Sequence, residues 1–283
     1  MITGDWYQHG IRIDSIPVDD RAVQYGDGVF ETIAVRDASP RCWSLHMTRL
    51  QLACDRLGLT MPVRNILRRD LDNALARTAV NTAFCAAKLV ISAGGTERGY
   101  HRPKHVRSIS RIGIFPATTL HDDAYRLGVV TRRCQTILAS QPRLAGIKSL
   151  NRLDQVIARN EWSAPNIFDG LMCDDDENLI CGTRTNLFVV REDHIETPSL
   201  HRCGVSGIMR QRIIELLAKS NIAVTEMAIG SEEFGSFDEV FLSNSQIGVV
   251  PVRQCDEHNW SPGEATRSVM ALLAYNGVPE CRP

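Results

Sequence analysis

An excess of charge of either sign is missing from this sequence: 32 lysines and arginines stand against 33 aspartates and glutamates, a net charge of −1. Such a chain has no global field to attract nucleic acid or an anionic membrane. It also lacks any apolar run approaching the ~20 residues of a membrane span. The stretch MITGDWYQHGIRID is neither a secretory signal nor a transit peptide. We therefore expect a cytoplasmic protein that binds neither nucleic acid nor a membrane.

The nine cysteines include no C-x-x-C pair. They are scattered and odd in number, which favours reduced thiols, mostly in the core, over a disulfide framework. His101 and His105 are four residues apart, but Pro103 between them argues against a helix that presents both to one metal. We predict no metal site. The chain also has neither a Walker loop nor a G-x-G-x-x-G motif, so nucleotide binding has no support.

The 283 residues, 43% of them hydrophobic, suffice for one large or two ordinary domains. Residues 29–35 are rich in β-branched and aromatic side chains and predict a strand. Residues 44–57 have helical spacing and end before a glycine. We predict an α+β or mixed α/β fold with a smaller α+β domain at 1–116 and a larger one at 117–283.

A lysine stands within the stretch AGIKSLNRLDQVIARNEW, residues 145–162. We predict a helix over 149–162 with one buried face, capped by Ser149 or Asn151. Lys148 would then lie on the loop that enters the helix. On position alone it is a solvated loop lysine, but at the wall of a core it would lose enough solvation to be nucleophilic. The residues of the expected buried face are Leu150, Leu153, Val156 and Ile157.

Two places have features of anion-binding sites. Gly207 opens a predicted helix, so its amide and those of Ile208 and Met209 can point at an anion, helped by the helix dipole. Asn244 and Ser245 follow a predicted strand and can add a hydroxyl and further amides. Taken alone, Gly207 is better interpreted as an ordinary loop residue.

Two basic residues have an open interpretation. Arg49 lies in the predicted helix 44–57 and in isolation is a surface arginine. Lys88 lies in the middle of AAKLVIS. It must face solvent on an edge strand or contact a carboxylate, because burying an unpaired charge is costly.

Several motifs follow one another along the chain and together cover most of it. They are YGDGVFET (25–32), HMTRL (46–50), KLVISAGGTERGY (88–100), GIKSLNRLDQV (146–156), NLF (186–188), GVSGIMR (204–210) and DEVFLSNSQIGVVPV (238–252). As a set they resemble the class IV aminotransferase family of pyridoxal phosphate enzymes. The lysine motif resembles the K-[ST]-L-N-R-L-[DE]-Q-V of the aminodeoxychorismate lyases most closely. The K-x-G-G-N-Y of branched-chain transaminases and the K-S-L-N-L-L of D-amino-acid transaminases are less similar.

The resemblance implies a two-domain α+β subunit of fold type IV, usually a homodimer, with pyridoxal 5'-phosphate as cofactor. It casts Lys148 as the residue joined covalently to the cofactor and Arg49 as a ligand of the cofactor phosphate. Lys88 and Arg98 fall where the lyases hold the carboxylates of their substrate, and Thr32 where they keep a hydroxyl near the reacting carbon. The rest of the phosphate site would come from Gly207, Ile208, Met209, Asn244 and Ser245.

The implied activity is that of a carbon–oxygen lyase of folate biosynthesis. It would convert 4-amino-4-deoxychorismate to 4-aminobenzoate and pyruvate, with Lys148 and Thr32 as catalytic residues. The alternatives are a D-amino-acid or branched-chain transaminase, and a non-catalytic descendant that binds the cofactor.

One position departs from the family pattern. In the family a glutamate five residues before the asparagine of NLF pairs with the pyridine nitrogen of the cofactor. Here that position is Cys181, in LICGTRTNLF. A carboxylate keeps the ring nitrogen protonated and the ring a good electron sink, which a neutral thiol does poorly. Either the sink is weaker, or another group such as Arg184 rearranges the site, or the activity is altered.

Overall fold

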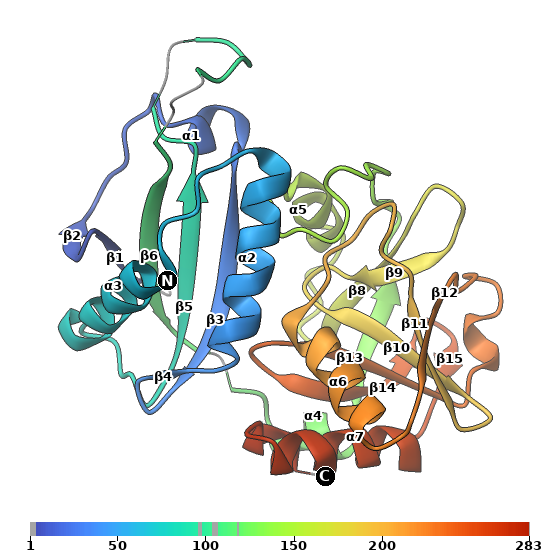
Figure 1. Ribbon diagram of the computed structural model, residues 1–283. Coiled ribbons are helices and arrows are strands. Elements are labelled where there is room, and N and C mark those ends of the chain that lie inside the picture. Colours follow the sequence, from blue (N-terminus) through green and yellow to red (C-terminus); the bar gives the residue numbers. More distant parts are fainter. Residues whose placement is uncertain (1–3, 96–97, 104–106, 118, 283) are drawn as a thin grey trace. The chain divides into compact units, whose positions relative to one another are not determined.

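The computed structural model describes residues 4–95, 98–103, 107–117 and 119–282. The chain divides into two compact units (Figure 1). One comprises Met1–Thr118 and Ile147–Asn151, and the other Thr119–Gly146 and Arg152–Pro283. The short segment Ile147–Asn151 therefore belongs to the first unit, although second-unit residues flank it on both sides. The predicted domain ranges, 1–116 and 117–283, do not include this crossing.

The first unit is built on a six-stranded antiparallel sheet in the order β2-β1-β6-β5-β3-β4. Its strands are β1 (Asp5–Gln8), β2 (Ile11–Ile13), β3 (Gly28–Arg36), β4 (Ser39–Pro40), β5 (Phe84–Ser92) and β6 (Ile109–Pro116). Its helices are α1 (Arg21–Tyr25), α2 (Trp43–Leu57) and α3 (Arg64–Arg77).

Alternation along β3 decides which side chains are buried. Successive residues of a strand point to opposite faces. One face of β3 is at most 1% exposed, and α2 and α3 cover this side of the sheet (Figure 1). The opposite face carries Phe30 and Thr32, which are half-buried. The residues of the covered face are Val29, Glu31, Ile33 and Val35.

The second unit contains a nine-stranded sheet that closes on itself. The strand order β10-β13-β14-β7-β8-β9 returns to β10, because β9 also pairs with β10. Its strands are β7 (Val129–Arg133), β8 (Ile167–Cys173), β9 (Leu179–Gly182), β10 (Asn186–Arg191), β11 (His194–Pro198), β12 (Val224–Met227), β13 (Glu239–Asn244), β14 (Gly248–Cys255) and β15 (His258–Asn259). Its α-helices are α4 (Asp122–Arg126), α5 (Leu153–Arg159), α6 (Ile208–Lys219) and α7 (Glu264–Tyr275).

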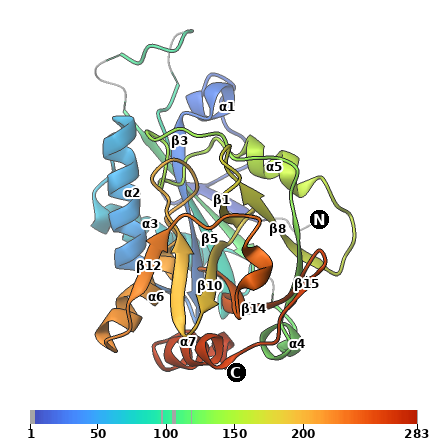
Figure 2. The same cartoon turned by 90° about the vertical axis from the view of Figure 1, so that its right-hand side faces the viewer.

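Helices α6 and α7 pack on strands β13 and β14 of this sheet, and Figure 2 shows α7 across the lower end of the strands. Glu239 fixes α7 in place, because its carboxylate accepts hydrogen bonds from the amides of Ala265 and Thr266 at 3.1 and 2.8 Å. Inside the sheet, Phe188 and Phe241 stack with ring centroids 4.8 Å apart. Sheet and helices thus share one core, and the fold is α+β, as predicted.

The prediction for the helix after Lys148 is wrong in two respects. Helix α5 covers only Leu153–Arg159 and follows Arg152 at its N-cap, because the residues before it pair with β3 at Ser149 and belong to the first unit. Its apolar residues are also not a buried face. Leu153, Val156 and Ile157 are 73%, 52% and 57% exposed.

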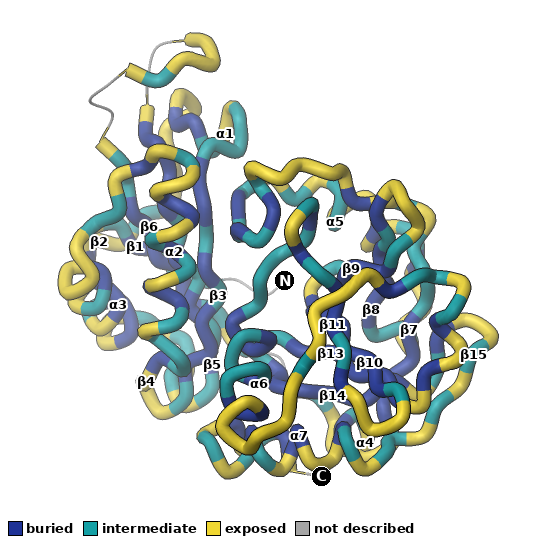
Figure 3. Tube along the Cα trace, turned by 45° about the vertical axis from the view of Figure 1, so that its right-hand side comes forward, coloured by how far each residue is buried: buried dark blue, intermediate teal, exposed yellow. Residues whose placement is uncertain are grey.

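Exposed positions otherwise gather on the loops and on the outer turns of the helices, whereas the strands are mostly buried (Figure 3). Among the described residues, no helix combines the length and the apolar character that a bilayer crossing requires.

Candidate active site

Lys148 lies on an extended segment that pairs with the beginning of β3. The amide of Phe30 donates to the carbonyl of Lys148, and the amide of Leu150 donates to the carbonyl of Gly28, both at 2.9 Å. The Lys148 amine lies 4.4 Å from the centroid of the Phe30 ring, within the range of a cation–π contact. The side chain is half-buried. Lys148 is therefore fixed on the edge of a strand and is not a solvated loop lysine.

A buried cluster lies on the covered face of β3, where α2 brings two side chains to Glu31. Arg49 donates from Nε to Oε1 of Glu31 at 2.8 Å and from Nη2 to Oε2 at 2.5 Å. Nδ1 of His46 lies 2.6 Å from the same Oε2. The side chains of Glu31, His46 and Arg49 are only 2%, 0% and 9% exposed. Residues three apart on a helix share a side, which lets one carboxylate reach both.

The bonding pattern assigns the protonation of this cluster. Burial acts to raise the pKa of Glu31, but the Arg49 charge and the hydrogen bonds from His46 and Arg49 outweigh it and hold the pKa at about 2. Burial lowers the pKa of His46, with the charges of Arg49 and Lys148 adding to the shift against the Glu31 contact, so the imidazole is neutral. Since an ionised carboxylate only accepts hydrogen bonds, the proton lies on Nδ1. Nε2 is then a buried acceptor with no partner among the described residues.

Thr32 and Lys88 lie opposite each other in the β3–β5 pairing and share a face with Phe30. The Lys88 amine is 4.9 Å from the centroid of the Phe30 ring, and burial lowers its pKa. The alternative that places Lys88 on an edge strand is wrong. β5 lies between β3 and β6 and is no edge strand. Within the described ranges, no carboxylate forms an ion pair with Lys88.

Arg98 is exposed, in contrast to Lys88. The residues that follow it are held by Arg21, which donates to the carbonyls of Gly99 and Tyr100 at 2.8 and 3.0 Å. The role of Arg98 as a ligand of the substrate stays a prediction.

In the second unit, α6 begins at Ile208, directly after Gly207, as predicted. No side chain caps its first turn. A Cβ at position 207 would lie 1.8 Å from Oδ1 of Asn186, so the close approach of that side chain requires glycine. Nδ2 of Asn186 donates to the carbonyl of Val205 at 2.8 Å and holds the loop before the helix. The amides of Ile208 and Met209 thus begin a 12-residue helix whose positive end suits an anion.

The end of β13 lies beside Asn186, the residue that also approaches Gly207. Oδ1 of Asn244 accepts from the amides of Gln246 and Ile247 at 2.9 and 3.1 Å, which folds a turn around Ser245. Ser243 pairs with Asn186 across the sheet, and its Oγ is buried without a hydrogen-bond partner in the described ranges. Sequence reasoning did not single out Asn186 or Ser243. The signal was available at Asn186, a polar residue at the start of an apolar strand.

Cys181 lies on β9 opposite Asn186. Burial, aided by the negative charge of Asp169, raises the pKa of the thiol to about 12, so it is neutral at pH 7. Asp169 does not replace the missing carboxylate. Its oxygens accept from the hydroxyls of Thr183 and Thr185 at 2.6 and 2.8 Å. Arg184 is the residue that the sequence suggested could rearrange the site in place of the family's glutamate. Its guanidinium donates to the carbonyl of Phe168 at 2.7 Å.

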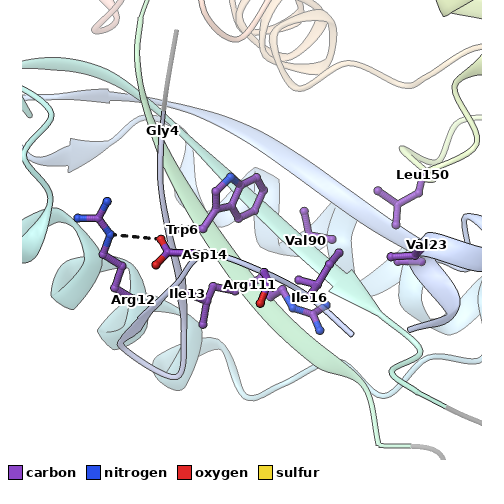
Figure 4. Close-up of a pocket in the computed structure, with 12 residues that line it drawn as sticks. Gly4, Trp6, Arg12, Ile13, Asp14, Ile16, Val23, Val90, Arg111 and Leu150 are labelled. Carbon is purple, nitrogen blue, oxygen red and sulfur yellow. Dashed lines mark ion pairs between the residues drawn. The ribbon is translucent and has the colours of Figure 1, made fainter. Parts of the chain in front are cut away.

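A separate pocket of about 530 Å³ opens in the first unit (Figure 4). Arg12 and Asp14 form an ion pair of 3.8 Å on one wall, and the Arg111 guanidinium is bound to Asp20 at 2.7 Å. The charged groups are therefore paired, and none of the predicted site residues lines the pocket. Its apolar lining includes Trp6, Ile16, Val23, Val90 and Leu150.

Comparison with known proteins identifies the family. The family described as amino-transferase class IV matches residues 28–255 of this chain. The chain belongs to the class IV aminotransferase family. The two-domain α+β fold expected from the resemblance, that of the fold-type-IV pyridoxal phosphate enzymes, is thereby confirmed.

Relatives within this family include both lyases and transaminases. Aminodeoxychorismate lyase of Vibrio harveyi is 32% identical over 253 residues, which are 87% of this chain and 90% of that protein. The crystal structure of 4-amino-4-deoxychorismate lyase from Pseudomonas aeruginosa matches with a TM-score of 0.90 and 36% identity, covering 96% of this chain and 99% of that one. D-alanine aminotransferase of Listeria innocua is 24% identical over 260 residues, covering 86% and 83%.

Proposed function

We propose that this protein is a pyridoxal-phosphate-dependent lyase that converts 4-amino-4-deoxychorismate into 4-aminobenzoate and pyruvate. The observation that carries the proposal is the position of Lys148, a half-buried amine held on the edge of β3 against Phe30, in the unit that also contains Arg49. The similarity to the lyases of Pseudomonas aeruginosa and Vibrio harveyi over most of both chains supports the choice of reaction.

The side chains present fit a phosphorylated aldehyde. A primary amine binds an aldehyde covalently, which we assign to Lys148. A guanidinium and an uncapped helix start suit a phosphate dianion, which we assign to Arg49 and to the amides of Ile208 and Met209. The buried Oγ of Ser243, which has no hydrogen-bond partner among the described residues, adds a donor that a bound group can use. Gly207, Asn244 and Ser245 complete the proposed phosphate site.

Pyridoxal phosphate, when bound, supplies an electron sink for the carbon next to the substrate amine. We assign the proton transfers to Lys148. When the amine of the substrate displaces Lys148, the freed Lys148 amine removes the proton from the amine-bearing ring carbon. The carbon–oxygen bond to the enolpyruvyl group then breaks, the electron pair leaves with the oxygen, and the ring becomes aromatic. Lys148 returns the proton to the departing group, which becomes pyruvate, and the hydroxyl of Thr32 assists.

The substrate carries two carboxylates, and we assign them to Lys88 and Arg98. Lys88 shares a face of the sheet with Thr32 and contacts the same aromatic ring as Lys148. Two cationic groups suit a dicarboxylate, whereas an amino acid with one carboxylate would not need both.

The decisive experiment is an absorbance spectrum of the purified protein followed by an assay of 4-aminobenzoate release. Lys148→Ala is expected to remove the absorbance band of the covalently bound cofactor and to abolish release. Full turnover by this variant would refute the mechanism. Conversion of the cofactor to its pyridoxamine form by an amino acid alone would identify a transaminase. A cofactor band without turnover of any amine would identify a non-catalytic descendant.

We also propose a homodimer that works in the cytoplasm. Three apolar side chains of α5 are more than half exposed, and their spacing of three and four residues puts them on one side of the helix, where a second chain can cover them. The nine free thiols suit a reducing compartment.

A further inference from the structure

The buried carboxylate of Glu31 joins two residues of α2 into one rigid group. Both of its oxygens are used: Oε1 accepts from Nε of Arg49, and Oε2 accepts from Nη2 of Arg49 and Nδ1 of His46. The carboxylate itself is fixed by β3, whose pairing with β5 continues on both sides of it. The three side chains are almost completely removed from solvent.

Two parallel hydrogen bonds constrain a guanidinium more than one does. The contacts through Nε and Nη2 set the plane of the Arg49 fork and direct its remaining N–H groups away from Glu31. The negative charge of Glu31 also offsets the positive charge of Arg49. The pair therefore presents aligned donors to an anion more than it presents net charge.

We propose that Glu31 is a positioning residue that holds the Arg49 guanidinium in the orientation from which its outer N–H groups recognise the cofactor phosphate. This inference rests on the proposed function, because it takes Arg49 as a phosphate ligand. His46 contributes because its Nδ1 also binds Oε2 of Glu31, which keeps the carboxylate from rotating.

The test compares two aldehydes that differ only in the phosphate. Cofactor-free protein is titrated with pyridoxal phosphate and with pyridoxal. The dissociation constant for pyridoxal divided by that for pyridoxal phosphate measures phosphate recognition. Glu31→Gln is expected to reduce this ratio about tenfold, the loss of one well-aligned charge-assisted hydrogen bond, and to leave pyridoxal binding unchanged. Arg49→Ala is expected to reduce the ratio at least as far. The double variant should lose no more than Arg49→Ala, since Glu31 acts through Arg49.

Two further variants separate positioning from stability and from charge. Asp20→Asn removes another buried carboxylate of the first unit, bound to Arg111 at 2.7 Å, and should leave the ratio unchanged. Glu31→Asp keeps the negative charge but withdraws the carboxylate from the fork, so it should reduce the ratio as Glu31→Gln does. It also serves as the test if Glu31→Gln does not fold.

Each other result overturns the inference. An unchanged ratio in the folded Glu31 variants, an equal loss in Asp20→Asn, or additive losses in the double variant would show that Glu31 only stabilises the fold. Wild-type protein that binds neither aldehyde would overturn the proposed function, and this inference with it. Normal wild-type binding with unaffected Glu31 variants would overturn this inference alone.

Discussion

The type of side chain at position 181 determines whether this buried position carries a negative charge. The Cys181 thiol is neutral because burial raises its pKa to about 12. The positive charge of Arg152, which already acts on the thiol, favours the ionised form of a carboxylate at this position, and a protonated pyridine nitrogen would add to that effect. An ionised neighbour keeps a pyridine nitrogen protonated, whereas a neutral thiol does not.

Cys181→Glu should therefore favour transamination. We expect the variant to convert the bound cofactor to its pyridoxamine form with D-alanine about tenfold faster than wild type, the effect of roughly one pKa unit on the electron sink. Rapid-mixing absorbance spectroscopy measures this rate. Cys203→Ser, a change at another buried thiol, should leave it unaltered. A rate equal to or below that of wild type in Cys181→Glu would contradict the expectation.

Glu31 was overlooked although its strand was predicted correctly. The alternation of Val29, Glu31 and Ile33 places the carboxylate on the face that the apolar residues bury. A buried carboxylate needs partners, so the pattern alone indicates an ion-pair site. The identity of the partners is a different matter. Arg49 and His46 have the right spacing on a helix, but the strand that this helix covers is set by tertiary packing, which no local pattern encodes.

The start of helix α6 depends on one close contact, between Gly207 and the side chain of Asn186. Gly207→Ala would place a methyl group 1.8 Å from Oδ1 of Asn186. The side chain or the helix must then move, and we expect a loss of about 1–3 kcal/mol in the free energy of unfolding, as for other overpacked sites. Urea denaturation measures the loss, and the preference for pyridoxal phosphate over pyridoxal should fall with it.

Gly230→Ala is the matched control for this change, because the atoms nearest to its added methyl group are 3.8 Å away. Equal stability of the two variants would mean that the contact with Asn186 adjusts without cost.

Helix α5, in contrast, carries apolar side chains that are exposed to solvent in the single chain. Ile157→Glu places a charge in the middle of this surface, where the side chain is 57% exposed, and should convert a wild-type dimer to monomers. Sedimentation velocity measures the change. Ile222→Glu, at a site that is 43% exposed and lies outside α5, should leave the dimer intact. A dimer that survives Ile157→Glu would exclude α5 from the interface.

The contrast between α5 and α2 shows what the spacing of apolar residues can and cannot predict. In α2 the apolar spacing and Gly58 predicted the helix and its end at Leu57. In α5 the spacing was equally regular, but periodicity does not distinguish a face that meets the core from one that meets solvent or another chain. The start of α5 was also misplaced, because residues 147–151 pair with a strand more than a hundred residues earlier.

At the scale of the whole molecule, the buried cluster on β3 sets a dependence of stability on pH. The pKa of folded His46 lies below its ordinary value of 6.5, mainly through burial. The unfolded chain therefore binds a proton at higher pH than the folded one. The stability that comes from keeping His46 neutral is present above pH 6.5 and is lost as the pH falls below it. Glu31, with a pKa lowered from 4.5 to about 2, adds a second loss below pH 4.5.

His46→Gln should remove the first of these losses. We expect the unfolding free energy of wild type to decline as the pH drops below 6.5, and that of the variant to decline less steeply. Urea denaturation across a pH series measures both slopes. His101→Gln, at an exposed histidine, should retain the wild-type slope. Identical slopes for His46→Gln and wild type would show that the imidazole is already protonated in the folded protein.

The segment Ile147–Asn151 ties the two units together covalently in an unusual way. The chain passes between them after residues 118, 146 and 151, and Lys148 is delivered to the first unit from the middle of the second. A gene fragment that stops at residue 118 would leave the edge of β3 without its hydrogen-bonded neighbour and would lack Lys148, the amine on which the proposed function depends. Recombination between related genes at that point would combine one parent's strand with the other parent's lysine. The first unit is thus complete only when residues from both halves of the chain are present.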